Sequence, residues 1–154
     1  MPPARSWQRL PAEPAGPARP LCLLLLDGVL EQVAFARRAE DLRRSPNVLA
    51  VEPAKHAPAP MLLDRVAKRL TKRLPGVPRV IVLIGPVQYP LARALLTRHP
   101  EAELWYASRP GDDDVLARER ATFVFSADDD PSVGAFQVNR ELWDRLEALG
   151  VAQR

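Results

Sequence analysis

The sequence has few of the cysteines, histidines and long apolar runs that disulfide-bonded, zinc-binding or membrane-spanning proteins need. Among 154 residues Cys22 is the only cysteine, so an intramolecular disulfide is excluded. No apolar run approaches the ~20 residues that cross a bilayer. The two histidines, His56 and His99, have no second histidine or cysteine at metal-ligand spacing. We therefore expect a cytoplasmic protein in a reducing compartment, with Cys22 as a small core side chain.

Glycine and aromatic residues are also scarce where function would use them. None of the seven glycines forms a G-x-G-x-x-G or Walker pattern after an apolar run. Gly28 and Gly85 stand alone and are predicted to serve turn geometry. A self-contained dinucleotide or nucleoside-triphosphate site is therefore not expected, and no cofactor is predicted for the chain alone. Aromatics make up only 6% of the residues, and none alternates with basic residues, which argues against a nucleic-acid partner.

The charge that is present gathers in one segment. The formal net charge is only +3, but five basic side chains decorate the predicted helix 61–74 opposite its leucines. They are Arg65, Lys68, Arg69, Lys72 and Arg73. The ordinary interpretation is the solvated side of an amphipathic helix. The alternatives are contact with an anionic membrane and, for a non-catalytic interaction module, recruitment of a protein partner.

Five short apolar runs organise the rest of the chain, at residues 21–27, 47–53, 79–85, 102–108 and 122–128. They alternate with segments of helical periodicity, at 31–44, 61–74, a stretch after Gly85-Pro86 that contains Leu91 and Leu95, 113–120 and 132–149. Such alternation predicts an α/β fold: a single doubly wound, Rossmann-like, parallel five-stranded sheet with helices on both faces. Residues 1–20 are rich in proline and arginine and are predicted to be a disordered tail, followed by one domain over 21–151.

Sheets of this kind bind ligands beyond the carboxyl ends of their strands, so residues at those ends are the candidates for chemistry. Asp27 closes the first run, and His56 follows the second, where it could act as a general base. Aspartates also follow the fourth run, at 112–114, and the fifth, at 128–130. Aspartates before helices commonly act as N-caps. If the first and fifth strands are close, Asp27, Asp128 and Asp130 could instead hold Mg²⁺ for phosphoryl transfer.

Two further resemblances bear on that alternative. Residues 126–135 resemble the acidic strand-to-helix turn of Toprim domains, for which Glu52 would be the required earlier glutamate. The segment around Asp27 resembles haloacid-dehalogenase phosphatases, but Leu25 stands where their nucleophilic aspartate would be. The second comparison therefore fails, and the first leaves a Mg²⁺-dependent Toprim-like domain as an alternative.

Three stretches resemble the N-terminal, acceptor-side domain of GT-B nucleotide-sugar glycosyltransferases. The first is a basic helix at 35–44 followed by "V-x-x-V-E-P" at 48–53. The second is a strand–helix–strand unit at 85–95 and 103–106. The third is 119–126, similar to "A-D-x-V-F-x-V-S", with a following helix that ends Leu-x-x-x-Gly at Gly150.

The resemblance implies an acceptor-binding crevice bordered by Asp27, Gly28, Gln88, Tyr89 and Ser108. In such enzymes a second, C-terminal domain holds most of the sugar nucleotide. These 154 residues contain no counterpart of that domain, so we expect no sugar transfer by this chain alone. The expected partner is a chain that supplies the donor-binding domain, and the alternative is another copy of this chain in a homo-oligomer.

Overall fold

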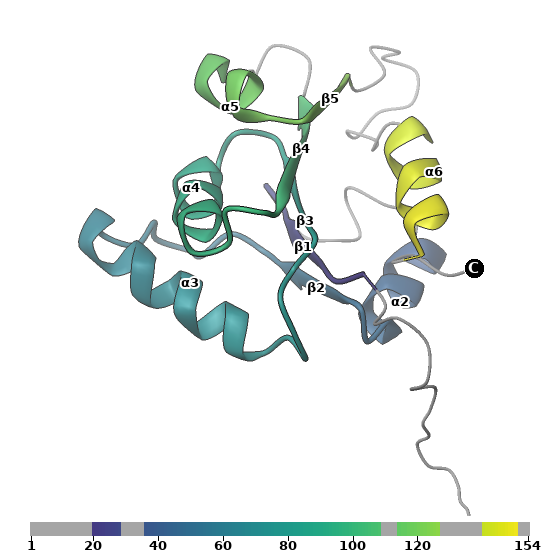
Figure 1. Ribbon diagram of the computed structural model, residues 1–154, viewed down its shortest axis with the longest axis horizontal. Coiled ribbons are helices and arrows are strands. Elements are labelled where there is room, and N and C mark those ends of the chain that lie inside the picture. The colour runs from purple at the N-terminus through teal and green to yellow at the C-terminus, as the bar shows by residue number, and fades with distance from the viewer. Residues whose placement is uncertain (1–19, 29–35, 109–113, 127–139, 151–154) are drawn as a thin grey trace, which may run out of the picture.

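The computed structural model describes residues 20–28, 36–108, 114–126 and 140–150. It confirms the predicted α/β architecture, with one five-stranded sheet in which every pairing is parallel (Figure 1). The strands are β1 (Cys22–Leu25), β2 (Val48–Val51), β3 (Val80–Ile84), β4 (Glu103–Ser108) and β5 (Phe123–Ser126). Their order across the sheet is β2-β1-β3-β4-β5.

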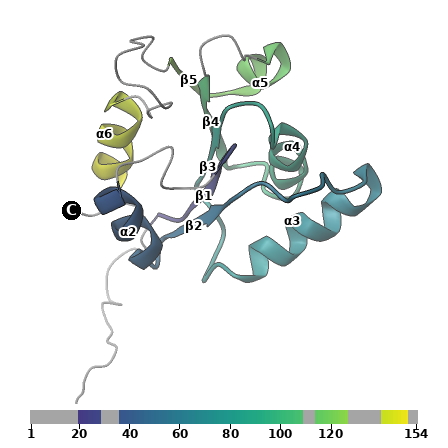
Figure 2. The same ribbon diagram turned by 180° about the vertical axis from the view of Figure 1, so that it is seen from behind.

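Helices cover both faces of this sheet (Figures 1 and 2). One face carries α2 (Ala36–Arg44) and α6 (Arg140–Leu149). The other carries α3 (Leu63–Lys72), α4 (Tyr89–Arg98) and α5 (Val115–Arg120). The two groups of helices lie on opposite sides of the strands in both views.

The central strands are apolar throughout because both of their faces are covered. Successive residues of a strand point to opposite faces, so Leu24 packs toward α2 and α6 while Leu23 and Leu25 pack toward α3 and α4. Every residue of β1 and β3 is buried. The edge strand β2 is half-buried along its whole length, as expected where one side of the ladder has no neighbouring strand.

Local signals account for the helix ends. The segment predicted as one helix over 61–74 begins instead as a 3-10 turn, η1 (Pro60–Leu62), and its α-helix ends at Lys72, two residues short of Leu74. At the C-terminal end, Pro75 disfavours the helical conformation of Leu74, the residue before it. Gly150 ends α6 with a positive φ of 93°, and its N–H donates to the carbonyls of Leu146 and Glu147.

The strand order contains one reversal of winding direction. From β1 the chain moves outward to β2, then crosses back to β3 on the other side of β1. The resulting order, 2-1-3-4-5, is one of the two common strand orders of doubly wound parallel sheets. The β1–β3 junction is therefore the place where loops leave the sheet in opposite directions.

Several predictions concern residues outside the described ranges. They include residues 1–19 of the predicted tail, the first parts of the predicted helices 31–44 and 132–149, the capping role of Asp130, and residue 151 at the end of the predicted domain. Among the helices of the described residues, none combines the length and apolarity required to span a bilayer.

Candidate functional site

The reversal point brings together the ends of β1 and β3. Asp27 and Gly28 follow β1, and Gly85 follows β3, which pairs directly with β1. Gly85 has a φ of 71°, in the left-handed region that favours glycine. A side chain at this position would collide with the Asp27 carboxylate, which packs against the glycine backbone. The turn geometry predicted for Gly85 is confirmed, and it positions Asp27 over the junction.

Gln88 ties this junction to the neighbouring strand. Its Nε2 donates to the carbonyl of Leu26 at 2.7 Å and to the carbonyl of Val51 at 2.9 Å. One side chain from the turn before α4 thus uses both amide hydrogens to hold the carboxyl ends of β1 and β2. Asp27, Gly28 and Gln88, three of the predicted crevice residues, therefore lie at one junction, and the Gln88 amide already has a structural role there.

The other two predicted crevice residues are buried. Tyr89 is 7% exposed, and its hydroxyl donates to the carbonyl of Leu116 at 3.4 Å. Ser108 is 6% exposed, and its hydroxyl donates to the carbonyl of Phe125 at 3.4 Å. Tyr89 joins α4 to α5, and Ser108 joins β4 to β5. A direct contact of either side chain with a ligand stays a prediction.

One of the aspartates after β4, Asp114, caps the N-terminus of α5. The Oδ1 of Asp114 accepts from the backbone N–H groups of Leu116 and Ala117, at 2.8 and 3.2 Å. Its own N–H donates to the hydroxyl of Tyr106, a fully buried tyrosine, at 3.0 Å. The N-cap interpretation is thus confirmed for Asp114. Asp112 and Asp113 lie outside the described residues.

The predicted magnesium site depended on closeness of the first and fifth strands, and that condition is not met. Strands β3 and β4 lie between them, which separates β1 and β5 by about 14 Å at the usual strand spacing. Glu52, the glutamate needed by the Toprim alternative, follows β2 at the opposite edge from β5. Asp128 and Asp130 lie outside the described ranges, and within those ranges no three His, Cys, Asp or Glu side chains cluster as metal ligands.

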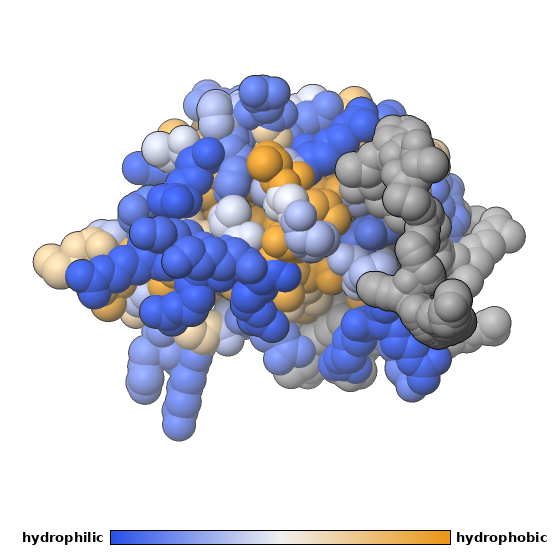
Figure 3. Space-filling model, turned by 60° about the horizontal axis from the view of Figure 1, so that its bottom comes forward, coloured by the Kyte–Doolittle hydropathy of each residue, from blue (hydrophilic) through white to orange (hydrophobic). Residues whose placement is uncertain are grey.

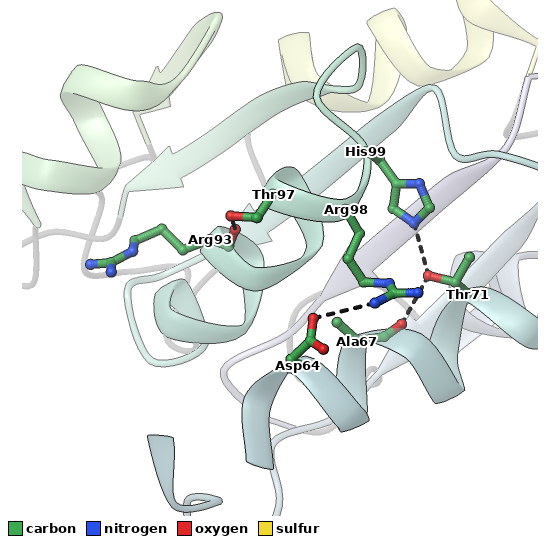
Figure 4. A network of polar contacts seen from close by, with 7 residues as sticks. All are labelled: Asp64, Ala67, Thr71, Arg93, Thr97, Arg98 and His99. Atoms are coloured by element: carbon green, nitrogen blue, oxygen red, sulfur yellow. Dashed lines mark hydrogen bonds and ion pairs between the residues drawn. The ribbon is translucent and has the colours of Figure 1, made fainter. Parts of the chain in front are cut away.

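The two histidines have different surroundings. His56 is exposed in the loop after β2, with no geometry that tests its proposed role as a base. His99, at the end of α4, is hydrogen-bonded to Thr71 of α3 (Figure 4). The Thr71 hydroxyl donates to the carbonyl of Ala67, so the Nε2–H of His99 is the donor to Thr71 Oγ1, at 2.8 Å. This contact was missed in the sequence because 28 residues separate its members.

Burial, followed by the charge of Arg98, lowers the pKa of His99 below its usual 6.5. Arg98 in turn pairs with Asp64 of α3 at 3.3 Å (Figure 4). The two contacts connect α3 to α4, which cover the same face of the sheet. They are structural contacts, remote from the β1–β3 junction.

Cys22 is an inert core residue, as predicted. It is 1% exposed at the start of β1, and burial raises the pKa of its thiol to about 12. A thiol in that state is not a nucleophile at neutral pH.

A hollow lies at the edge formed by β2 and α2. Its volume is about 420 Å³, and it is lined by Leu42, Arg43, Val48, Leu49, Ala50 and Glu52. No predicted crevice residue lines it. Of its lining residues, Glu52 is the one that the sequence singled out, as the glutamate of the Toprim alternative.

Comparison with known proteins adds no family assignment: no family model, curated protein or solved structure matches this chain.

Proposed function

We propose that this chain is an acceptor-side, glycosyltransferase-like domain that binds a sugar-containing acceptor at the β1–β3 junction and transfers no sugar by itself. The observation that carries the proposal is the placement of Asp27, Gly28 and Gln88 at the reversal of the strand order. Open α/β sheets bind their ligands at such reversals, beyond the carboxyl ends of the strands.

The elements that carry the resemblance to GT-B enzymes support this proposal. The basic segment 35–44 and the "V-x-x-V-E-P" stretch fold largely as α2 and β2, and 85–106 contains the turn, α4 and part of β4. The helix that ends at Gly150 is α6. These helices and strands are of the types that the resemblance implies for the same segments.

The chemistry of the junction suits a neutral, hydroxyl-rich ligand. The carboxylate of Asp27 is an acceptor of the kind that binds sugar hydroxyls. A donor-binding domain outside these 154 residues would supply the nucleotide-sugar site. The reaction would then occur between the two domains.

Saturation-transfer NMR with a panel of methyl glycosides tests the proposal. We expect at least one glycoside to bind the chain, and Gln88→Ala, which releases the ends of β1 and β2, to weaken that binding. The matched control is Thr97→Ala on the exposed side of α4, where the hydroxyl bonds only within its own helix, to Arg93 (Figure 4).

Two results would contradict the proposed function. One is sugar transfer from UDP-glucose or GDP-mannose by the purified chain alone. The other is a lack of glycoside binding combined with calorimetric binding of Mg²⁺ that is lost in Asp27→Asn, which would favour the phosphoryl-transfer alternative.

A further inference from the structure

The two faces of the domain differ in charge. The sequences of α3, α4 and α5 contain eight basic and two acidic residues. Those of α2 and α6, on the other face, contain six basic and five acidic residues. A chain with a formal net charge of only +3 therefore concentrates its positive charge on one face. Figure 3, which brings the lower side of Figure 1 forward, shows a broad band of hydrophilic side chains over the region of α3.

Exposed apolar side chains lie beside this charge. Met61 and Leu62 form η1 at the start of α3 and are 83% and 40% exposed. Val87 precedes α4, and Val115 and Leu116 begin α5, where they are 66% and 59% exposed. These helices all start at the carboxyl edge of the parallel sheet, so the five side chains form an apolar rim along that edge, on the face of α3, α4 and α5.

We infer that this basic face and its apolar rim form a docking surface for an anionic lipid bilayer. Peripheral membrane surfaces combine these two elements: basic side chains attract anionic headgroups, and aliphatic side chains insert between them. The inference goes beyond the proposed function and does not depend on it.

A bilayer fits the rim better than nucleic acid does. Sequence-tolerant binding of single-stranded nucleic acid uses exposed aromatic rings on which bases stack. Among the described residues, every exposed large hydrophobic side chain is aliphatic. Aliphatic side chains at the edge of a basic face have no partner in a phosphate backbone, whereas a bilayer offers both headgroup charge and an apolar interior.

Vesicle co-sedimentation tests the electrostatic part. We expect the full chain to bind vesicles of phosphatidylcholine mixed with phosphatidylglycerol, to bind phosphatidylcholine alone far more weakly, and to dissociate as salt is raised. The double variant Arg69→Glu/Lys72→Glu should lose at least about tenfold in affinity, because each basic residue near the surface contributes about 1 kcal/mol. Its matched control is Arg43→Glu/Arg44→Glu on α2, the same change of charge on the opposite face, which should bind as the wild type does.

Site-specific labelling tests insertion of the rim. Because Cys22 is buried, Met61→Cys provides the only accessible thiol among the described residues. A bimane attached there should be quenched by brominated lipids on vesicle binding. The control label is Val77→Cys, which is also exposed but lies before β3, at the opposite edge of the sheet, and should not be quenched.

Circular dichroism melting of each variant separates loss of folding from loss of binding. The inference is overturned if folded wild-type protein ignores anionic vesicles, or if the α2 variant loses as much affinity as the α3 variant. It is also overturned if both labels are quenched equally. Tighter binding to polyuridylate than to anionic vesicles at the same salt would assign the face to nucleic acid instead.

Discussion

Gly85 is the residue on which the geometry of the β1–β3 junction depends most. Its φ of 71° and the Asp27 carboxylate packed against it leave no space for a side chain. We predict that Gly85→Ala lowers the free energy of unfolding by about 1 to 3 kcal/mol, from the left-handed conformation and the displaced carboxylate together. Urea denaturation measures this loss.

The control for that substitution is Gly76→Ala. A methyl group there meets only the Leu21 side chain at an ordinary 3.4 Å, and the glycine is exposed. Its effect should be close to zero, or slightly stabilising through the unfolded chain. Equal losses at the two glycines would contradict the special geometry assigned to Gly85.

Gln88 gives a second prediction for the junction. Removal of its amide in Gln88→Ala leaves the carbonyls of Leu26 and Val51 without that donor, which should lower the free energy of unfolding by about 1 to 3 kcal/mol. Gln88→Glu should lower the free energy of unfolding further at neutral pH, because it places a carboxylate against two carbonyl oxygens. Below the pKa of the new carboxyl group the protonated side chain regains one donor, so the Glu variant should recover part of its stability. An unchanged gap between the two variants across pH would contradict the assigned hydrogen bonds.

At the scale of single elements, α5 is a six-residue helix that depends on its cap. Asp114→Ala should lower the free energy of unfolding by about 1 kcal/mol, since two N–H groups of the first turn lose their acceptor. Asp114→Asn keeps an acceptor oxygen and should cost less. Denaturation of the two variants side by side checks the order, and an equal effect would mean that the side chain does not act as a cap.

The contact between α3 and α4 predicts a dependence of stability on pH. The pKa of His99 is lower in the folded protein than its usual 6.5, so the unfolded state binds more protons in the range between these values. The stability that neutral His99 contributes is fully present above about pH 6.5 and is lost as the pH falls through the lowered, folded-state pKa. In His99→Gln the decline of unfolding free energy between neutral pH and about pH 5 should be shallower than in the wild type.

His56→Gln is the control for this measurement, because His56 is the other histidine and is exposed. Its profile should follow that of the wild type. A His99→Gln profile that also follows the wild type would show that His99 does not titrate differently in the folded and unfolded states.

For the whole molecule, much of the fold could be predicted from the sequence, because strands buried on both faces appear in it as short continuous apolar runs. The five strands lie within the five apolar runs. Strand β1 has an apolar residue at every position because neither face of that strand meets water. Helix limits were less accurate: residues 60–62 form a 3-10 turn where the predicted α-helix begins.

The arrangement of the site was harder to predict, because strand order is a property of the assembled sheet. The sequence alone could not tell that β3 and β4 separate β1 from β5, and the magnesium alternative depended on the opposite assumption. Asp27, Gly28 and Gln88 were correctly identified as residues at strand ends. The bridging role of Gln88 depends on carbonyls 62 and 37 residues away, which no local pattern reveals.

The central claim is that the β1–β3 junction is the ligand-binding end of this domain. The most direct test is a titration of ¹⁵N-labelled protein with the tightest-binding glycoside of the panel, followed by the shifts of the backbone amides. We predict the largest shifts at residues 26–28, 85, 87 and 88, with Gly76 and Val77 at the opposite edge of the sheet unaffected. Shifts centred on the hollow beside β2 and α2, or spread equally over both edges, would contradict the claim.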